Sequence, residues 1–114
     1  MLFSASVWNH KFSEVLVEAT DCSVKVSVKY DAPQSAYKSR RASMNHYRFK
    51  ARARFASGAK AAGPVFSSSK PGAQSQTFSF DTTSEGCWAR QPQSLVAMDV
   101  EGCRGESCTV EPFK

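Results

Sequence analysis

The clearest pattern in the chain is a run of nine residues, Tyr47–Phe55, in which uncharged and cationic side chains alternate without exception. An alternation with a period of two is typical of a β-strand that buries one face and leaves the other in solvent. We expect the buried side to be formed by Tyr47, Phe49, Ala51, Ala53 and Phe55. The solvent side would carry Arg48, Lys50, Arg52 and Arg54. At a rise of about 3.3 Å per residue the strand would be about 30 Å long, so these four cations would form a row.

A weaker alternation before this strand predicts a β-hairpin. Residues 10–19 and 22–30 would form its two strands, with a turn at 20–21. In that register Val17 would face Val24, and the valines would make a continuous apolar face. The acidic residues of the first strand would lie beside the lysines of the second and neutralise them in part.

The segment between the hairpin and the alternating strand, residues 31–46, has two interpretations. A short helix over about 32–44 would have Asp31 as its N-cap and Pro33 in its first turn. An irregular loop would hold the same cations more loosely. Either structure would add positive charge near the alternating strand.

The second half of the chain begins with a long segment that has no regular pattern. Residues 56–75 are rich in Ala, Gly, Ser and Pro, and we expect them to form a mobile loop. Three short strands would follow, at 77–81, 94–101 and 108–113. In the strand at 94–101, the inward side chains would be Val96, Met98 and Val100.

Together these elements predict a mainly β protein with about six antiparallel strands. A small sandwich, a strongly bent sheet or a partly open barrel would each accommodate them, with or without the short helix. The length of 114 residues and the apolar content of 41% suit one domain, residues 1–114, with a single modest core. No stretch approaches the roughly 18 consecutive apolar residues of a transmembrane helix.

The four cysteines, Cys22, Cys87, Cys103 and Cys108, lack the close paired spacing of a zinc site, so we expect neither a metal nor another cofactor. Two disulfides, Cys22–Cys87 and Cys103–Cys108, are favoured, because the last two cysteines enclose a short glycine-containing segment that can turn tightly. Disulfides would favour a periplasmic or secreted location. The N-terminus carries no secretory signal, so a cytoplasmic protein with four reduced thiols is the alternative.

The charge of the chain is concentrated in one part of it. Residues 22–57 contain nine Lys or Arg and one acidic residue, Asp31, for a local charge of +8. The whole chain carries +5, so the remaining residues sum to −3. Such segregation indicates an electrostatic surface, or a solvated face that keeps the protein soluble.

The function favoured by these features is non-enzymatic binding of an anionic partner. The row formed by Arg48, Lys50, Arg52 and Arg54 would be the binding surface, with support from Lys25, Lys29, Lys38, Arg40 and Arg41. The partner could be a nucleic-acid backbone, an acidic glycan, an anionic lipid headgroup or an acidic protein surface. Base recognition is disfavoured, because the aromatic side chains of the strand lie on the side opposite to its cations.

Two alternative functions remain. His10 and His46 each follow an asparagine and precede an aromatic-bearing strand, and together they could act as acid and base in a small phosphodiester hydrolase. In the other alternative, the basic row is the subunit interface of a homo-oligomer. The row of one copy would then meet acidic residues of another, namely Glu14, Glu18, Asp99 and Glu101.

Overall fold

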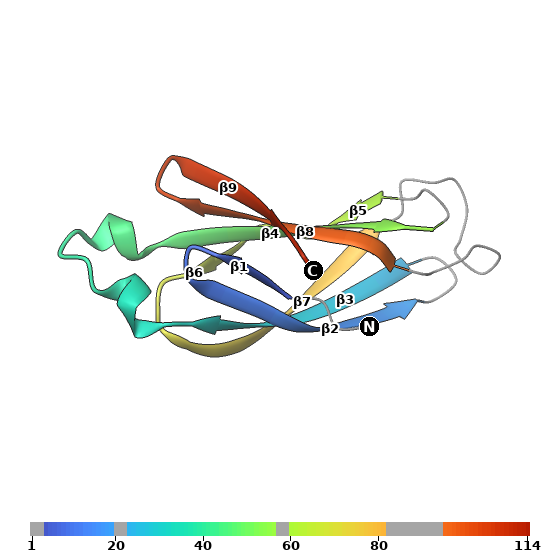
Figure 1. The fold of residues 1–114 in the computed structure, drawn as a ribbon, viewed down its shortest axis with the longest axis horizontal. Coiled ribbons are helices and arrows are strands. Elements are labelled where there is room, and N and C mark those ends of the chain that lie inside the picture. Colours follow the sequence, from blue (N-terminus) through green and yellow to red (C-terminus); the bar gives the residue numbers. More distant parts are fainter. Residues whose placement is uncertain (1–3, 20–22, 57–59, 82–94) are drawn as a thin grey trace.

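A computed structural model describes residues 4–19, 23–56, 60–81 and 95–114. The described residues form two antiparallel β-sheets (Figure 1). Sheet A has the strand order β1 (Ala5–Val7), β2 (His10–Ala19), β3 (Ser23–Ala32) and β7 (Gly72–Asp81). Sheet B has the order β5 (Lys60–Ala62), β4 (Tyr47–Phe55), β8 (Leu95–Arg104) and β9 (Ser107–Pro112), and β6 (Phe66–Ser68) also pairs with β4. The mainly β, antiparallel fold expected from the sequence is therefore confirmed, and of the expected alternatives it is the one with two sheets.

The hydrophobic core lies between the two sheets, because the inward positions of both are apolar. The alternation predicted for β4 is confirmed along its whole length. Its buried residues, each at most 5% exposed, are Tyr47, Phe49, Ala51, Ala53 and Phe55. The rings of Phe12 in sheet A and Phe49 in sheet B pack edge to face, with centroids 5.1 Å apart.

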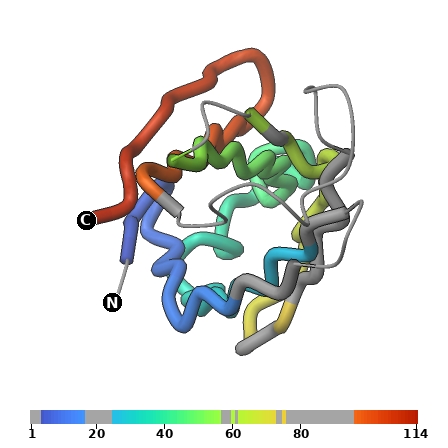
Figure 2. The backbone as a smooth tube through the Cα atoms, turned by 90° about the vertical axis from the view of Figure 1, so that its right-hand side faces the viewer, coloured from blue at the N-terminus to red at the C-terminus, as the bar shows by residue number. Residues whose placement is uncertain are grey.

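The two sheets also meet at one corner. The backbones of Ser4 and Lys114 exchange two N–H···O hydrogen bonds of 2.9 and 2.8 Å, which connect the residue before β1 to the end of the chain after β9. The view along the long axis shows the backbone arranged around this common interior (Figure 2).

A second contact between the sheets comes from the turn that joins β1 to β2. This turn consists of two residues, Trp8 and Asn9. Both have positive φ angles, 50° and 64°, which are typical of a tight two-residue hairpin turn. The indole N–H of Trp8 donates a hydrogen bond of 2.8 Å to the carbonyl of Gly102 on β8. A side chain at Gly102 would approach Trp8 Cδ1 to 3.0 Å and Val7 Cγ2 to 2.8 Å, so this close approach requires glycine.

The first hairpin is present, but its register differs from the expected one by two residues. Val17 stands opposite Val26 rather than Val24. A shift of two keeps the side chains of Leu16–Ala19 on their expected faces, so the alternating pattern does not distinguish the two registers there.

The same hairpin contains a β-bulge that the sequence did not reveal. The register shifts between Ser13 and Leu16, and Glu14 has a positive φ of 56°. The extra residue changes the phase of the alternation. As a result, Phe12 before the bulge and Val15 after it both pack on the core.

The connection expected to be one short helix or a loop contains two short 3₁₀-helices, η1 (Gln34–Tyr37) and η2 (Ala42–Asn45). They lie at the end of the sandwich from which β4 begins (Figure 1). The side chain of Asn45 accepts a hydrogen bond from the Ser39 N–H and donates one to the Ser39 carbonyl, each of 3.0 Å. Because these bonds satisfy backbone groups that a continuous helix would pair, the segment bends instead.

The segment expected to be a loop over 56–75 is not irregular throughout. Within the described part of it, β5 pairs with the C-terminal half of β4 and β6 pairs with the N-terminal half, along the same edge. Strands of three residues are too short to produce a readable alternation, which explains why the sequence did not predict them.

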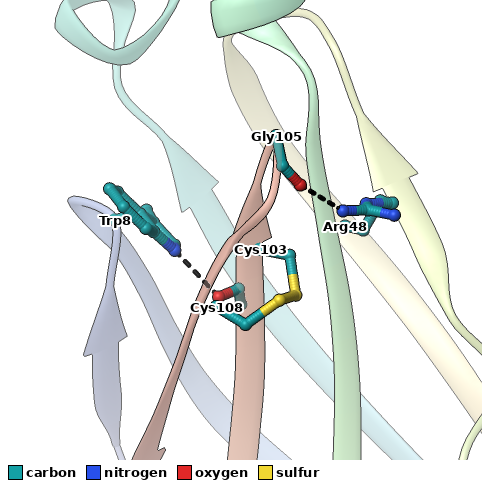
Figure 3. The surroundings of a disulfide bond; sticks show 6 residues. Trp8, Arg48, Cys103, Gly105 and Cys108 are labelled. Atoms are coloured by element: carbon teal, nitrogen blue, oxygen red, sulfur yellow. Dashed lines mark hydrogen bonds between the residues drawn. A yellow bond between two sulfur atoms is a disulfide. The ribbon is translucent and has the colours of Figure 1, made fainter.

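The last hairpin confirms one predicted disulfide. Cys103 of β8 and Cys108 of β9 are register partners with Cα atoms 4.1 Å apart, and a disulfide joins them (Figure 3). The turn between the strands contains Gly105 with a φ of 60°. The predicted Cys22–Cys87 pairing lies outside the described residues and stays a prediction.

The predicted inward face of β8 is correct in part. Met98 and Val100 are buried, at 3% and 0% exposure, whereas Val96 is 50% exposed. The register with β4 shifts here from Arg54 opposite Ala97 to Phe55 opposite Leu95, so Val96 is the extra residue of a β-bulge.

Candidate functional site

The outward-facing side of sheet B carries the cationic row that the sequence predicted. Because the uncharged residues of β4 point into the core, its cations point to solvent. Lys60 of β5 stands opposite Arg54, so it projects from the same side of the sheet. We call this surface the basic face and define it by Arg48, Lys50, Arg52, Arg54 and Lys60.

Two carboxylates of β8 lie within the basic face. Asp99 is the register partner of Arg52, and the Arg52 Nε–H donates a hydrogen bond of 2.7 Å to Asp99 Oδ1. Glu101 is the register partner of Lys50. Both side chains of the Arg52–Asp99 pair are partly exposed, so their attraction is worth about 1 kcal/mol or less. The cations of the face therefore remain in excess.

Arg48 and Arg54, at the two ends of the row, differ in their contacts. The guanidinium of Arg48 donates a hydrogen bond of 2.5 Å to the Gly105 carbonyl in the last hairpin (Figure 3). The side chain of Arg54 has neither a hydrogen bond nor an ion pair in the described part of the chain, and its register partners are Lys60 and Ala97.

A hollow of about 550 Å³ lies at the Arg54 end of the basic face. The charged residues that line it in the described part of the chain are Arg52, Arg54, Lys60 and Asp99. Ala62 and Ala97 also line it. These alanines stand opposite Arg52 and Arg54. Since their side chains are single methyl groups beside long cationic ones, they form the apolar floor of the hollow.

Most of the supporting cations proposed from the sequence do not join the basic face. Lys25 and Lys29 alternate with buried residues of β3, so they project from the outer side of sheet A, on the opposite side of the sandwich. Lys29 forms an exposed ion pair of 2.8 Å with Glu14, whose contact raises the lysine pKa. This pair confirms the predicted neutralisation within the first hairpin.

Lys38, Arg40 and Arg41 are exposed and lie in the connection between the two 3₁₀-helices. That connection is close in sequence to Arg48, the first cation of β4. It is at the opposite end of the row from the hollow.

The two histidines of the hydrolase hypothesis have different environments. His10 is fully buried, whereas His46 is exposed at the residue before β4. The Nδ1 of His10 lies 2.6 Å from the Trp8 carbonyl oxygen, and its Nε2 lies 2.5 Å from the Tyr37 hydroxyl. Both ring nitrogens are therefore engaged inside the core, which weighs against proton transfer to a substrate.

The partners of His10 determine its tautomer. A carbonyl oxygen can only accept, so Nδ1 carries the proton and donates it to Trp8. Nε2 then accepts from the hydroxyl of Tyr37, whose oxygen lies 2.7 Å from the Ser68 hydroxyl and can accept from it. Burial lowers the pKa of His10 below 6.5, although hydrogen bonds to the Trp8 and Val7 backbone act in the opposite direction. Burial raises the pKa of Tyr37, opposed by its bond to Ser68.

Neither a metal site nor a membrane-spanning helix is found in the described ranges. No group of three or more His, Cys, Asp or Glu side chains there is arranged to hold a metal ion. No helix among the described residues is long and apolar enough to span a bilayer. No protein-family model matches the chain, and no significant match was found among curated proteins or solved structures.

Sequence reasoning missed the residues that complete the hollow. Lys60 and Ala62 lie in the segment expected to be a loop, and only the pairing of β5 with β4 places them beside Arg52 and Arg54. The Lys60–Ala62 triplet has no pattern that could have shown this pairing.

Proposed function

We propose that the protein is a non-enzymatic binding module whose basic face holds an anionic polymer. The observation that carries this proposal is the arrangement of five cations on one side of sheet B with two carboxylates among them. An array of this kind attracts a polymer whose own charges are regularly spaced, because each contact releases condensed counterions.

The environment of the aromatic side chains favours contact with the polymer backbone over base recognition. Single-stranded nucleic acids are bound by aromatic rings exposed on the same surface as the cations. In β4, Tyr47, Phe49 and Phe55 are buried in the core, on the other side of the sheet. Charge complementarity therefore supplies the binding free energy of this face.

The disulfide bears on where the module would act. Cys103–Cys108 is compatible with an oxidising compartment, such as the periplasm or the extracellular space. Acidic polysaccharides occur in such compartments, which makes them the anionic polymers that we favour as partners.

The test is retention on immobilised heparin as a function of salt concentration. We expect the Lys50→Gln/Arg54→Gln variant to bind more weakly than the wild type and to show a salt slope smaller by about one to two units. The matched control is Lys25→Gln/Lys29→Gln, which removes the same charge from the outer side of sheet A. Equal losses in the two variants would mean that net charge alone causes retention, and the proposal would be wrong.

A further inference from the structure

We propose that the hollow beside Arg54 is a subsite for one anionic sugar residue of an acidic polysaccharide. This inference rests on the proposed function and adds to it a defined place where part of the polymer is recognised by shape. The rest of the basic face would contribute charge alone.

The shape of the hollow suits a sugar ring. Its floor contains the methyl groups of Ala62 and Ala97, and the ring of Pro112 also lines it. Small-ligand sites typically combine an apolar surface with a few polar groups that fix the orientation of the ligand. The C–H face of a pyranose would lie on this floor, while its charged substituents would reach the cations beside it.

The charges of the hollow suit sulfate or carboxylate groups. Arg54 and Lys60 are register partners on the same side of the sheet, so their side chains can reach one anion together. Arg52 is held in place by Asp99 through its Nε, which leaves its terminal nitrogens to donate to a ligand. Guanidinium groups bind planar or tetrahedral oxyanions through paired N–H donors. Among the described lining residues, three cations stand beside the single carboxylate of Asp99, so an anionic sugar residue is expected.

The described surroundings of the hollow favour a sugar over a nucleotide. The described residues of its lining include no aromatic side chain on which a base could stack. The Cys103–Cys108 disulfide in the same sheet is compatible with compartments in which acidic polysaccharides occur.

The test uses a size-defined, heparin-derived tetrasaccharide and calorimetry. Ala97→Leu fills the floor without changing any charge, and Arg54→Gln removes the exposed cation without altering the core. We expect each variant to weaken tetrasaccharide binding by about tenfold or more, which corresponds to about 1.4 kcal/mol. The matched control is Ser67→Leu, which adds the same bulk to the exposed partner of Arg48, outside the hollow, and should change the affinity by less than about twofold.

A second readout locates the ligand directly. In methyl-detected NMR spectra of the wild type, the tetrasaccharide should shift the resonances of Ala62 and Ala97. Unchanged methyl resonances, or an Ala97→Leu variant that binds like the wild type, would overturn the subsite. The proposed function would survive that result if the Lys50→Gln/Arg54→Gln variant still lost its salt-dependent retention on heparin.

Two further probes distinguish the class of ligand. Oligothymidylate of matched charge and vesicles containing anionic phospholipid should shift the two methyl resonances less than the tetrasaccharide does. A larger effect of either probe would assign the hollow to a nucleic acid or to a lipid surface and would overturn the sugar assignment.

Discussion

At the scale of single residues, the fold holds His10 in its neutral form within the core. The imidazole donates to Trp8 and accepts from Tyr37, and it has no exposed surface. Protonation would bury a charge, which opposes it. His10, a catalytic candidate in the sequence, therefore has the environment of a residue that stabilises the fold.

The lowered pKa of His10 predicts that acid destabilises the protein. The unfolded chain would take up this proton near pH 6.5, whereas the folded protein takes it up only at a lower pH. Between these two values the unfolded state binds more protons, so the free energy of unfolding should fall as the pH drops through this window. Urea denaturation from about pH 8 to about pH 5 would measure the effect.

The control for this prediction is His46→Gln, which removes the exposed histidine and leaves the buried hydrogen bonds in place. It should keep the pH dependence of the wild type. NMR titration of the His10 ring gives an independent check, and a midpoint at or above 6.5 in the folded protein would contradict the buried neutral form.

The hydroxyl of Tyr37 lies at the centre of this hydrogen-bonded chain. Tyr37→Phe would leave His10 Nε2 without a donor and Ser68 without its partner, so we expect a loss of about 1–3 kcal/mol in the free energy of unfolding. Ser68→Ala keeps the Tyr37–His10 bond and should cost less, about 1 kcal/mol. Chemical denaturation compares the two variants. A Tyr37→Phe protein as stable as the wild type would show that the hydrogen bonds among His10, Tyr37 and Ser68 do not contribute to stability.

At the scale of elements, the last hairpin is stabilised by three kinds of contact. β8 and β9 are paired in register, Cys103 and Cys108 are covalently linked, and Arg48 bonds the turn at Gly105 (Figure 3). The disulfide thus links β8 to β9, the edge strand of the sheet, beside Arg48 at one end of the basic face. The backbone pairing itself does not depend on the covalent bond.

Removal of this disulfide should lower stability without unfolding the hairpin. For so short a loop, the chain-entropy model predicts that Cys103→Ser/Cys108→Ser loses about 2 kcal/mol of the free energy of unfolding. Denaturation under non-reducing conditions measures the loss, and a variant as stable as the wild type would contradict it. Peptide mapping without reduction should recover Cys103 linked to Cys108 and would also test the Cys22–Cys87 pairing.

The strands that could not be predicted from the sequence are the shortest ones. The nine residues of β4 alternate over several periods, so both the strand and its buried face could be read directly. β5 and β6 have three residues each, which is less than two periods, and they were not recognised. The bulge at Glu14 was also missed. It changes which side chains of β2 face the core, and that core is formed by residues that are distant in the sequence.

At the scale of the whole molecule, the two outer faces have different charge patterns. The outer side of sheet B carries the basic face and its hollow. On the outer side of sheet A, Lys29 is paired with Glu14, and Lys25 has Glu18 as its register partner. The sandwich therefore places the cations of β3 and those of β4 on opposite outer faces.

This separation predicts a one-sided footprint of a bound polyanion. With heparin present, Lys50 and Lys60 should be acetylated more slowly, because the polymer would cover their amino groups. Lys25 and Lys29, on the other side of the sandwich, should react at the same rate with and without heparin. Mass spectrometry of the acetylated peptides measures these rates, and equal protection on both sides would argue against a single binding face.

The sequence by itself determined the strand class of the protein, the buried and exposed sides of β4, and the Cys103–Cys108 hairpin. Each of these follows from local chemistry, either a period of two or two cysteines separated by a tight turn. Only the tertiary structure decided which cations share a face, why Lys60 belongs with Arg54, and why His10 is buried. These outcomes depend on which distant strands pair and in which register, and that choice is made by packing across the whole core.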